Sequence, residues 1–223
     1  MSSFRTEPSR QGRARARGFT LIEMSISLGL LVILMSAVGQ VILVGSRAFR
    51  LGSAEEALTM KAKRTLDRIA DELEMAGVST LSPVPAPPFG TSWLRMRTPT
   101  ALVGDVVQYG SQTRIGLVPD PADPFNGIDD DGDGLVDEEF VQITKDVGLP
   151  SQRTVTLAEN ACRYLQGETP NGADDNGNAL VDERGLSFVL ENRQLTVRLT
   201  LQGVDQDRRP ITCTVQTTVK IRN

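Results

Sequence analysis

The sequence predicts an α+β protein in which one long N-terminal helix packs on an antiparallel β-sheet head. Two observations predict this fold: an apolar run that continues as an amphipathic segment, and a series of short strand-like runs in the C-terminal half. The chain of 223 residues, 39% of them hydrophobic, can bury one ordinary core beside an accessory segment. We therefore expect three parts: a basic arm over residues 1–18, a helix over 19–77 and a β-rich head over 78–223.

Charge and composition exclude several classes of function. The net charge is −4, but residues 1–18 hold five arginines and one glutamate, so the basic charge belongs to the arm. A nucleic-acid-binding face instead spreads basic residues over a fold and interleaves aromatics, which are only 4% of this chain. The chain has no histidine and no G-x-S-x-G motif, so the commonest general base and a common nucleophile are missing. We expect neither a nucleic-acid partner nor an enzyme.

The apolar run LIEMSISLGLLVILMSAVGQVILV over residues 21–44 predicts a membrane-spanning helix. It carries a single charge and is long enough to cross a hydrocarbon core of ~30 Å at ~1.5 Å per residue. The basic arm before it predicts a cytoplasmic N-terminus and places the head on the other side of the membrane. A cleaved signal peptide is the alternative, because residues 37–39 offer a small-x-small pattern, but the apolar run continues past that point.

Glu23 is a charge inside this apolar run and therefore requires a partner. A charged side chain in a membrane costs on the order of 2.5 to 3.5 kcal/mol on insertion scales, and the run contains no lysine or arginine. Cleavage between Gly18 and Phe19 would place a new α-amino group four residues before Glu23, on the same helical face. The same amine could instead meet Glu23 of a neighbouring copy. Cleavage would thus supply the missing cation.

The segment R-G-F-T-L-I-E over residues 17–23 resembles the processing site of type IV prepilins and of type II secretion pseudopilins. It combines a basic leader, a glycine at the cut, an aromatic first residue and a glutamate at the fifth mature position. The resemblance implies that a prepilin peptidase removes residues 1–18 and methylates the amine of Phe19, and that Glu23 guides docking onto other pilins. It also implies a bacterial inner-membrane protein with a periplasmic head, later built into a pilus or pseudopilus at the cell surface.

Beyond the apolar run, apolar positions recur at steps of three and four residues and predict an amphipathic helix. The opposite face is charged from Glu55 to Glu72, and Gly77 marks the expected end of the helix. Residues 64–73 and 218–223 resemble PilW-like minor pilins and the related J-type pseudopilins. The helix also lacks the proline of many major pilins, which favours a minor subunit. The apolar stripe comprises Leu51, Leu58, Thr65, Leu66, Ile69, Leu73 and Ala76.

The head begins after residues 81–90, whose four prolines cannot continue a helix. Runs of alternating or β-branched residues then predict short strands, and the turn over residues 191–193 predicts a hairpin. We expect these strands to form an antiparallel sheet that packs on the second half of the helix. The expected strands cover residues 93–97, 102–109, 113–118, 140–144, 154–157, 186–190, 195–201 and 211–221.

Two acidic segments of the head form an internal repeat at an interval of 45 residues: N-G-I-D-D-D-G-D-G-L-V-D-E from Asn126 and N-G-A-D-D-N-G-N-A-L-V-D-E from Asn171. Oxygen side chains at alternate positions, followed by a glycine, are typical of an EF-hand-like calcium loop. Phe140 stands where an EF-hand has its twelfth-position glutamate, so Asp137 or Glu138 must close a shorter loop. The first loop offers Asp129, Asp131, Asp133, the Leu135 carbonyl, Asp137 and Glu138.

The second loop has fewer charges, and Ala179 replaces the glycine of the turn. We expect calcium in the first loop, because hard oxygen ligands at this spacing favour calcium over zinc. A second, weaker calcium site and a decayed copy without metal are the two alternatives for the second loop. Calcium met outside the cytoplasm is expected to stabilise the head. The ligands that the second loop offers are Asp174, Asn176, Asn178, the Leu180 carbonyl, Asp182 and Glu183.

Cys162 and Cys213 lack C-x-x-C spacing and predict one disulfide in an oxidising compartment, with two buried free thiols as the alternative. The leading hypothesis for function is a structural subunit of a type IV pilus or type II secretion-like filament. The second hypothesis, from a different class, is a calcium-dependent adhesin or binding module displayed on such a filament.

Overall fold

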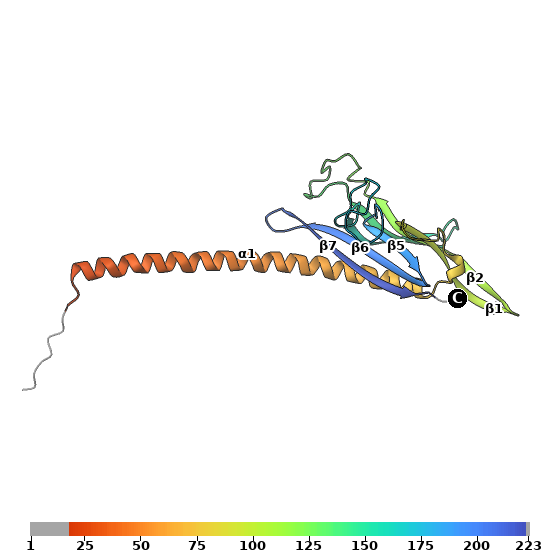
Figure 1. The fold of residues 1–223 in the computed structure, drawn as a ribbon, viewed down its shortest axis with the longest axis horizontal. Coiled ribbons are helices and arrows are strands. Elements are labelled where there is room, and N and C mark those ends of the chain that lie inside the picture. The colour runs from red at the N-terminus through yellow and green to blue at the C-terminus, as the bar shows by residue number, and fades with distance from the viewer. Residues whose placement is uncertain (1–17, 222–223) are drawn as a thin grey trace, which may run out of the picture. The chain divides into compact units, whose positions relative to one another are not determined.

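The computed structural model describes residues 18–221, which form one α-helix, one short 3₁₀-helix and seven β-strands. The long helix α1 (Leu21–Glu74) precedes the 3₁₀-helix η1 (Val78–Thr80), and all strands follow them in the chain (Figure 1). The expected α+β class is confirmed. The chain divides into two compact units, one up to Arg47 and one from Ala48 onward.

All seven strands of the described residues belong to one antiparallel sheet. Their order is β1-β2-β3-β4-β6-β5, and β7 pairs with β6 as well. β7 follows β6 along one side, while β5 and the end of β4 share the opposite side of β6. The strands are β1 (Trp93–Val103), β2 (Val106–Pro119), β3 (Glu139–Lys145), β4 (Arg153–Ala161), β5 (Leu186–Glu191), β6 (Gln194–Val204) and β7 (Pro210–Lys220).

Most of the expected strands are confirmed with longer bounds, but the separate strand expected over residues 102–109 is wrong. Val103 and Val106 pair with each other across a tight turn, so these residues end β1 and begin β2. Gly104 takes a φ of +61° in that turn, a conformation that glycine adopts without steric cost. The expected β5–β6 hairpin is confirmed, with Asn192 and Arg193 both at positive φ, as in a two-residue primed turn.

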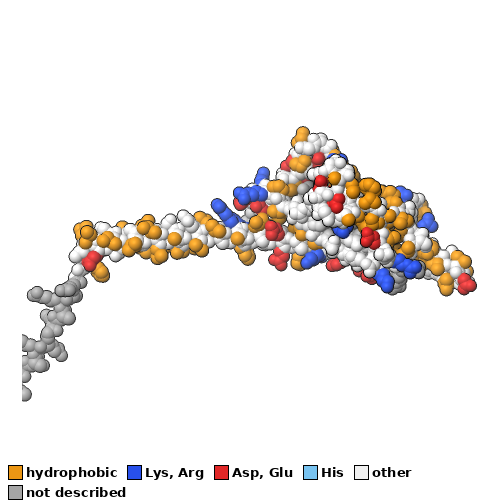
Figure 2. Space-filling model, viewed as in Figure 1, with side chains coloured by type: hydrophobic (Ala, Val, Ile, Leu, Met, Phe, Trp, Pro, Cys, Tyr) orange, Lys and Arg blue, Asp and Glu red, His pale blue; other side chains and the backbone are white. Residues whose placement is uncertain are grey.

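The described part of the first unit, residues 18–47, consists mostly of the apolar half of α1. Almost all of its residues are exposed, and hydrophobic side chains cover the N-terminal half of the helix in Figure 2. Within residues 18–221, α1 is the one helix that is long and apolar enough to cross a membrane. A helix that is hydrophobic all round is stable in lipid or inside a bundle of helices, not alone in water.

In the second unit, the amphipathic half of α1 packs one face on the sheet. Leu66, Ile69 and Leu73 are buried there, as the periodicity predicts. The expectation for Leu51 is wrong: this residue keeps 40% of its surface exposed. The buried face of α1 begins only at Leu58, about two helical turns further along the chain.

Glu72 also departs from the sequence-based expectation, which placed it on the solvent face of the helix. Its side chain is buried, and Nζ of Lys145 in β3 lies 2.6 Å from its Oε1. Arg68, one helical turn earlier, lies 3.2 Å from the same oxygen. These two cations compensate a charge that burial would otherwise penalise. Helical periodicity could not reveal Lys145, which comes from a distant strand.

α1 ends at Glu74, before the stop expected at Gly77. Gly77 has an extended backbone with a φ of −85° and directly precedes η1, so it is not a left-handed helix cap. A β-carbon on Gly77 would lie 2.8 Å from the ring of Tyr109. A side chain at this position would have to displace the ring, which β2 brings against the backbone.

The core of the second unit lies between α1 and the sheet. Phe188 of β5 and Leu199 of β6 are fully buried in it. Gly185, directly before β5, has its backbone pressed against the Cys162 carbonyl, and a β-carbon would lie 1.7 Å from that oxygen. This close approach fixes the point at which the loop between β4 and β5 returns to the sheet.

Candidate functional site

The expected cleavage pair, Gly18 and Phe19, precedes α1 in a segment without regular secondary structure. Both residues are exposed, and Phe19 keeps 84% of its surface accessible. Exposed segments with little local structure are preferred sites of proteolytic cutting. The bond between the two residues is therefore open to a peptidase. The rest of the expected leader, residues 1–17, lies outside the described residues.

Thr20 and Glu23 form a capping box at the start of α1. A Glu23 carboxylate oxygen accepts the backbone N–H of Thr20 at 2.8 Å, and the Thr20 hydroxyl accepts the backbone N–H of Glu23 at 3.3 Å. Such reciprocal bonds satisfy helix N–H groups that otherwise lack a partner. Glu23 takes part in none of the ion pairs among residues 18–221. Within residues 18–221 its carboxylate is thus held by a neutral hydroxyl and an amide, with no cation in ion-pair distance.

The first acidic loop connects β2 to β3 and is organised around Asp129. The Asp129 carboxylate accepts the N–H groups of Gly132 at 2.6 Å and Gly134 at 3.0 Å. Asp129, Asp131 and Asp133 each present an oxygen atom, and the three atoms lie within 4.8 Å of one another. Like charges at this separation repel, whereas calcium takes six to eight oxygen ligands at about 2.3 to 2.6 Å. The three side chains therefore fit a hard divalent cation.

Asp137 and Asp182 occupy equivalent positions in the two loops and make equivalent contacts. Asp137 Oδ1 accepts the N–H of Asn126 at 2.9 Å, and Asp182 Oδ1 accepts the N–H of Asn171 at 3.0 Å. Both aspartates have positive φ, 58° and 50° respectively. Each therefore ties the end of its loop to the beginning, which uses one oxygen that the sequence assigned to the metal.

Glu138 is the better placed of the two residues expected to close the first loop. Its side chain is buried, and Gln202 of β6 donates to its Oε1 at 2.9 Å. Burial, together with the nearby carboxylates of Asp123 and Asp133, raises the pKa of Glu138 to about 8. A cation between Asp133 and Glu138 would compensate this crowding of negative charge.

The second acidic loop connects β4 to β5 and repeats the backbone of the first. The Asp174 carboxylate accepts the N–H groups of Gly177 at 2.7 Å and Ala179 at 2.8 Å. Ala179 has a φ of +68°, where Gly134 of the first loop has +92°. The turn is therefore kept although alanine pays a steric penalty in this conformation. The other predicted ligands take part in equivalent short turns of the two loops. The side chains of Asp131 and Asn176 each accept the N–H two residues further on, and the N–H groups of Leu135 and Leu180 donate to the side chains two residues before them.

One difference between the side-chain contacts of the two loops concerns Asn178. Asn178 stands where the first loop has Asp133, and its amide donates to Glu183 at 3.0 Å. Glu183 is buried, as Glu138 is. Burial raises the pKa of Glu183, while the Asn178 hydrogen bond and the charge of Arg198 act in the opposite direction.

Sequence reasoning missed two buried carboxylates, Asp123 and Glu168, which lie 45 residues apart and so continue the repeat. Asp123 accepts the N–H of Asp130 at 3.0 Å, and Glu168 accepts the N–H of Asn176 at 3.1 Å. Each carboxylate therefore supports its loop from beneath. Extending the repeat alignment three residues upstream would have found them, because an acidic residue stands there in both copies.

The predicted disulfide between Cys162 and Cys213 is wrong, and both thiols are free. Ala161 of β4 and Cys213 of β7 pair with the same residue, Leu201, from opposite sides of β6. Because neighbouring strands lie ~4.8 Å apart, positions two strands apart are separated by about 10 Å. Disulfides require Cα atoms within about 7 Å. Burial raises the pKa of Cys162 to about 12, so it is also an unreactive thiol.

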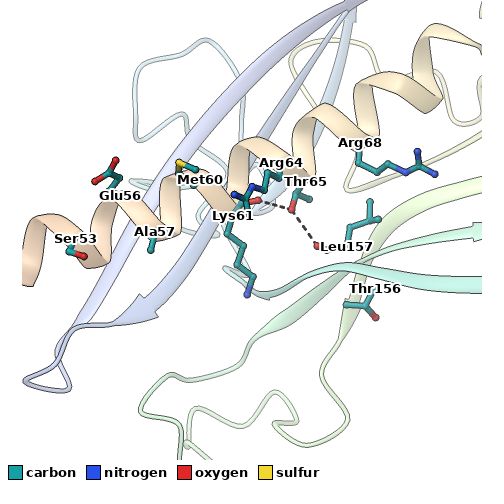
Figure 3. A pocket seen from close by; sticks show the side chains of 10 residues that line it. All are labelled: Ser53, Glu56, Ala57, Met60, Lys61, Arg64, Thr65, Arg68, Thr156 and Leu157. Carbon is teal, nitrogen blue, oxygen red and sulfur yellow. Dashed lines mark hydrogen bonds between the residues drawn. The ribbon is translucent and has the colours of Figure 1, made fainter.

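A groove of ≈ 720 Å³ runs between the amphipathic part of α1 and β4 (Figure 3). Lys61, Arg64 and Arg68 line its helix side, and Leu157 lines the strand side. Thr65 bridges the two elements, because its hydroxyl donates to the carbonyls of Lys61 at 2.9 Å and Leu157 at 3.4 Å. The groove is open and basic, and it contains none of the predicted site residues.

A comparison with protein-family models matches residues 13–39 to the prokaryotic N-terminal methylation motif. The matched residues include the expected cut between Gly18 and Phe19, Glu23 and most of the apolar half of α1. The match supports a type IV pilin-like or pseudopilin-like filament subunit that is processed by a prepilin peptidase, and it favours a structural role over catalysis. Neither the curated proteins nor the solved structures gave a match to the chain.

Proposed function

We propose that this chain is a minor pilin or pseudopilin of the PilW-like, J-type-related kind, which enters a type IV pilus or type II secretion-like filament after cleavage behind Gly18. The observation that carries the proposal is the exposed apolar surface of α1, which begins at the motif itself. From Leu21 to Val44 the large apolar side chains are exposed, and a surface of this size needs lipid or other helices around it.

The two environments that such a helix needs follow one another in filament assembly. The subunit first waits in the inner membrane, with its N-terminus cytoplasmic and its head periplasmic. It then moves into a filament, where the apolar halves of neighbouring subunits surround one another. The absence of proline from α1 and the likeness of residues 64–73 to minor pilins favour a subunit that initiates, caps or interrupts the filament.

Glu23 has a defined part in this transfer. Among the described residues, its carboxylate accepts hydrogen bonds from Thr20 alone. Cleavage and methylation leave a cationic amine on Phe19, and the Glu23 of an incoming subunit pairs with the Phe19 amine of the last one in the filament. Removing two opposite charges from lipid contact in one step favours docking, because an unpaired charge in the bilayer is costly.

The experiment that tests the proposal is the intact mass of the protein from membranes of cells with and without the prepilin peptidase. We expect a chain that begins at Phe19 and carries one added methyl group, and only when the peptidase is present. A Glu23→Gln variant should be cut in the same way but should not enter filaments. An uncut chain, or one that begins near Gln40, would refute the proposal.

We further propose that the head binds calcium in the first acidic loop. The donor set supports this, since Asp129, Asp131 and Asp133 converge and Glu138 adds a buried carboxylate beside them. Calcium supplies positive charge that the loop itself lacks and holds its turns together. Binding would occur on the periplasmic side of the membrane and would stabilise the head before assembly.

A further inference from the structure

Glu168 holds a buried carboxylate oxygen without a partner. The residue is 7% exposed. Its Oε1 accepts the N–H of Asn176 at 3.1 Å, which directs the carboxylate into the second acidic loop. Its Oε2 is inaccessible to solvent, and no donor among residues 18–221 lies within hydrogen-bonding distance of it. An ionised carboxylate in this position is costly unless a cation or a proton satisfies it.

The surroundings of Glu168 make the shortage of positive charge more severe. The carboxylates of Glu168 and Asp174 both act on the buried Glu183 as like charges. The nearest cation to Glu183, Arg198 Nη1, lies 3.8 Å from its Oε1, which is too long for a hydrogen bond. Among the described residues, Glu168 and Asp174 take part in no ion pair, and Arg198 is the one cation within 4.0 Å of Glu183.

The corresponding residue of the first loop, Asp123, has hydrogen-bond partners for both carboxylate oxygens. Asp123 accepts the N–H of Asp130 through Oδ1 at 3.0 Å and the N–H of Asp137 through Oδ2 at 2.5 Å. Both of its oxygens are therefore used by the backbone. Glu168 is one methylene longer, and its second oxygen is left over for a different partner.

From this difference we propose that the second acidic loop is a divalent-cation site, and that Glu168 is the ligand which replaces the charges lost at Asn176 and Asn178. The cation is a hard one such as calcium, because every available ligand atom is oxygen. Asp174, Glu183 and the Leu180 carbonyl complete the set. These carboxylates are not gathered as closely as Asp129, Asp131 and Asp133, so binding draws the loop together.

The proposal goes beyond filament assembly and is independent of it. It also distinguishes the two loops, since the first takes its charge from three aspartates within the loop and the second from a glutamate three residues before Asn171. A substitution in one loop should therefore leave calcium binding by the other intact.

Calcium titration calorimetry on the detergent-solubilised full chain, after treatment with a chelator, tests this proposal. We expect two ions per wild-type chain. Glu168→Gln should weaken one site at least ~10-fold and leave the other unchanged, whereas Asp131→Asn should weaken the other. The matched control is Glu191→Gln, which removes the same charge from the exposed β5–β6 hairpin and should leave both sites intact.

The calcium-free melting temperature distinguishes a ligand from a residue that merely supports the fold. Glu168→Gln removes an uncompensated buried charge, so without calcium it should melt no lower than the wild type. Two outcomes overturn the proposal. In one, Glu168→Gln still binds two ions with unchanged affinity; in the other, the wild type binds a single ion that Asp131→Asn removes. Neither outcome affects the result of the intact-mass experiment that tests cleavage behind Gly18.

Discussion

Arg184 and Glu139 join the ends of the two acidic loops. Nη2 of Arg184 lies 2.7 Å from Oε1 and 2.8 Å from Oε2 of Glu139, whose side chain is almost fully buried. Each residue directly follows its loop, and the two are 45 residues apart, so they occupy the same position of the repeat. Burial raises the pKa of Glu139, and the Arg184 charge opposes that rise. Opposite charges thus stand at the position directly after the repeat.

Breaking this pair should destabilise the head. Glu139→Gln leaves the Arg184 guanidinium without its counter-charge and should lower the free energy of unfolding by about 3 kcal/mol. Urea denaturation of the purified full chain in detergent measures the change. The exchanged double variant, Glu139→Arg with Arg184→Glu, should recover part of the loss. Equal stability of Glu139→Gln and the wild type would show that the pair contributes nothing.

Gly185 should tolerate no side chain. In Gly185→Ala the new β-carbon would meet the Cys162 carbonyl at 1.7 Å, and the contact involves backbone on both sides, so it cannot be relieved by a rotamer change. We expect loss of the folded head, measured by near-ultraviolet circular dichroism and limited proteolysis. The control is Gly203→Ala in β6, whose β-carbon would meet Leu58 at an ordinary 3.6 Å. This control should remain folded.

Calcium should raise the melting temperature of the head, and the first loop should be responsible for part of the effect. At free calcium a hundredfold above the dissociation constant, one site adds about 2.7 kcal/mol, or roughly 5 to 10 °C for a chain of this size. Asp131→Asn should abolish that share of the increase, while Asp105→Asn in the exposed β1–β2 turn should not. A melting temperature indifferent to calcium and chelator would remove the metal from the proposed function.

The two cysteines should remain thiols even after export to an oxidising compartment. Thiol titration in denaturant, without reductant, should count two free groups per chain, because Cys162 and Cys213 lie on opposite sides of β6. Reductant should leave the melting temperature unchanged. Recovery of thiols only after reduction would mean that the strands around β6 are arranged differently.

Much of the fold could be predicted because its signals are local. The apolar run, the three-and-four periodicity around Leu66 and the alternating residues of β6 each depend on near neighbours in the chain. Two of the errors arose where distant segments meet. Glu72 is buried because Lys145 reaches it from β3, and the backbone of Gly77 lies against the Tyr109 ring from β2.

For the candidate sites, too, local sequence patterns were informative and the contacts between distant segments could not be predicted. The repeat revealed both acidic loops, since glycines and aspartates at fixed spacing are a strong pattern. Asp123 and Glu168 were missed because a lone acidic residue before each motif resembles any surface charge until its burial is known. The disulfide was wrong because a sequence does not give the order of strands in a sheet, and β6 lies between the two cysteines.

The capping box at Thr20 and Glu23 has a consequence for the speed and strength of assembly. Because the two residues satisfy each other within one chain, the first turn of α1 is ordered before any neighbour arrives. Ordering a backbone residue costs about 1 to 2 kcal/mol, so a turn that formed only on docking would weaken each new contact by several kcal/mol. In the proposed filament the incoming helix is preorganised, and growth depends on subunits meeting in the bilayer.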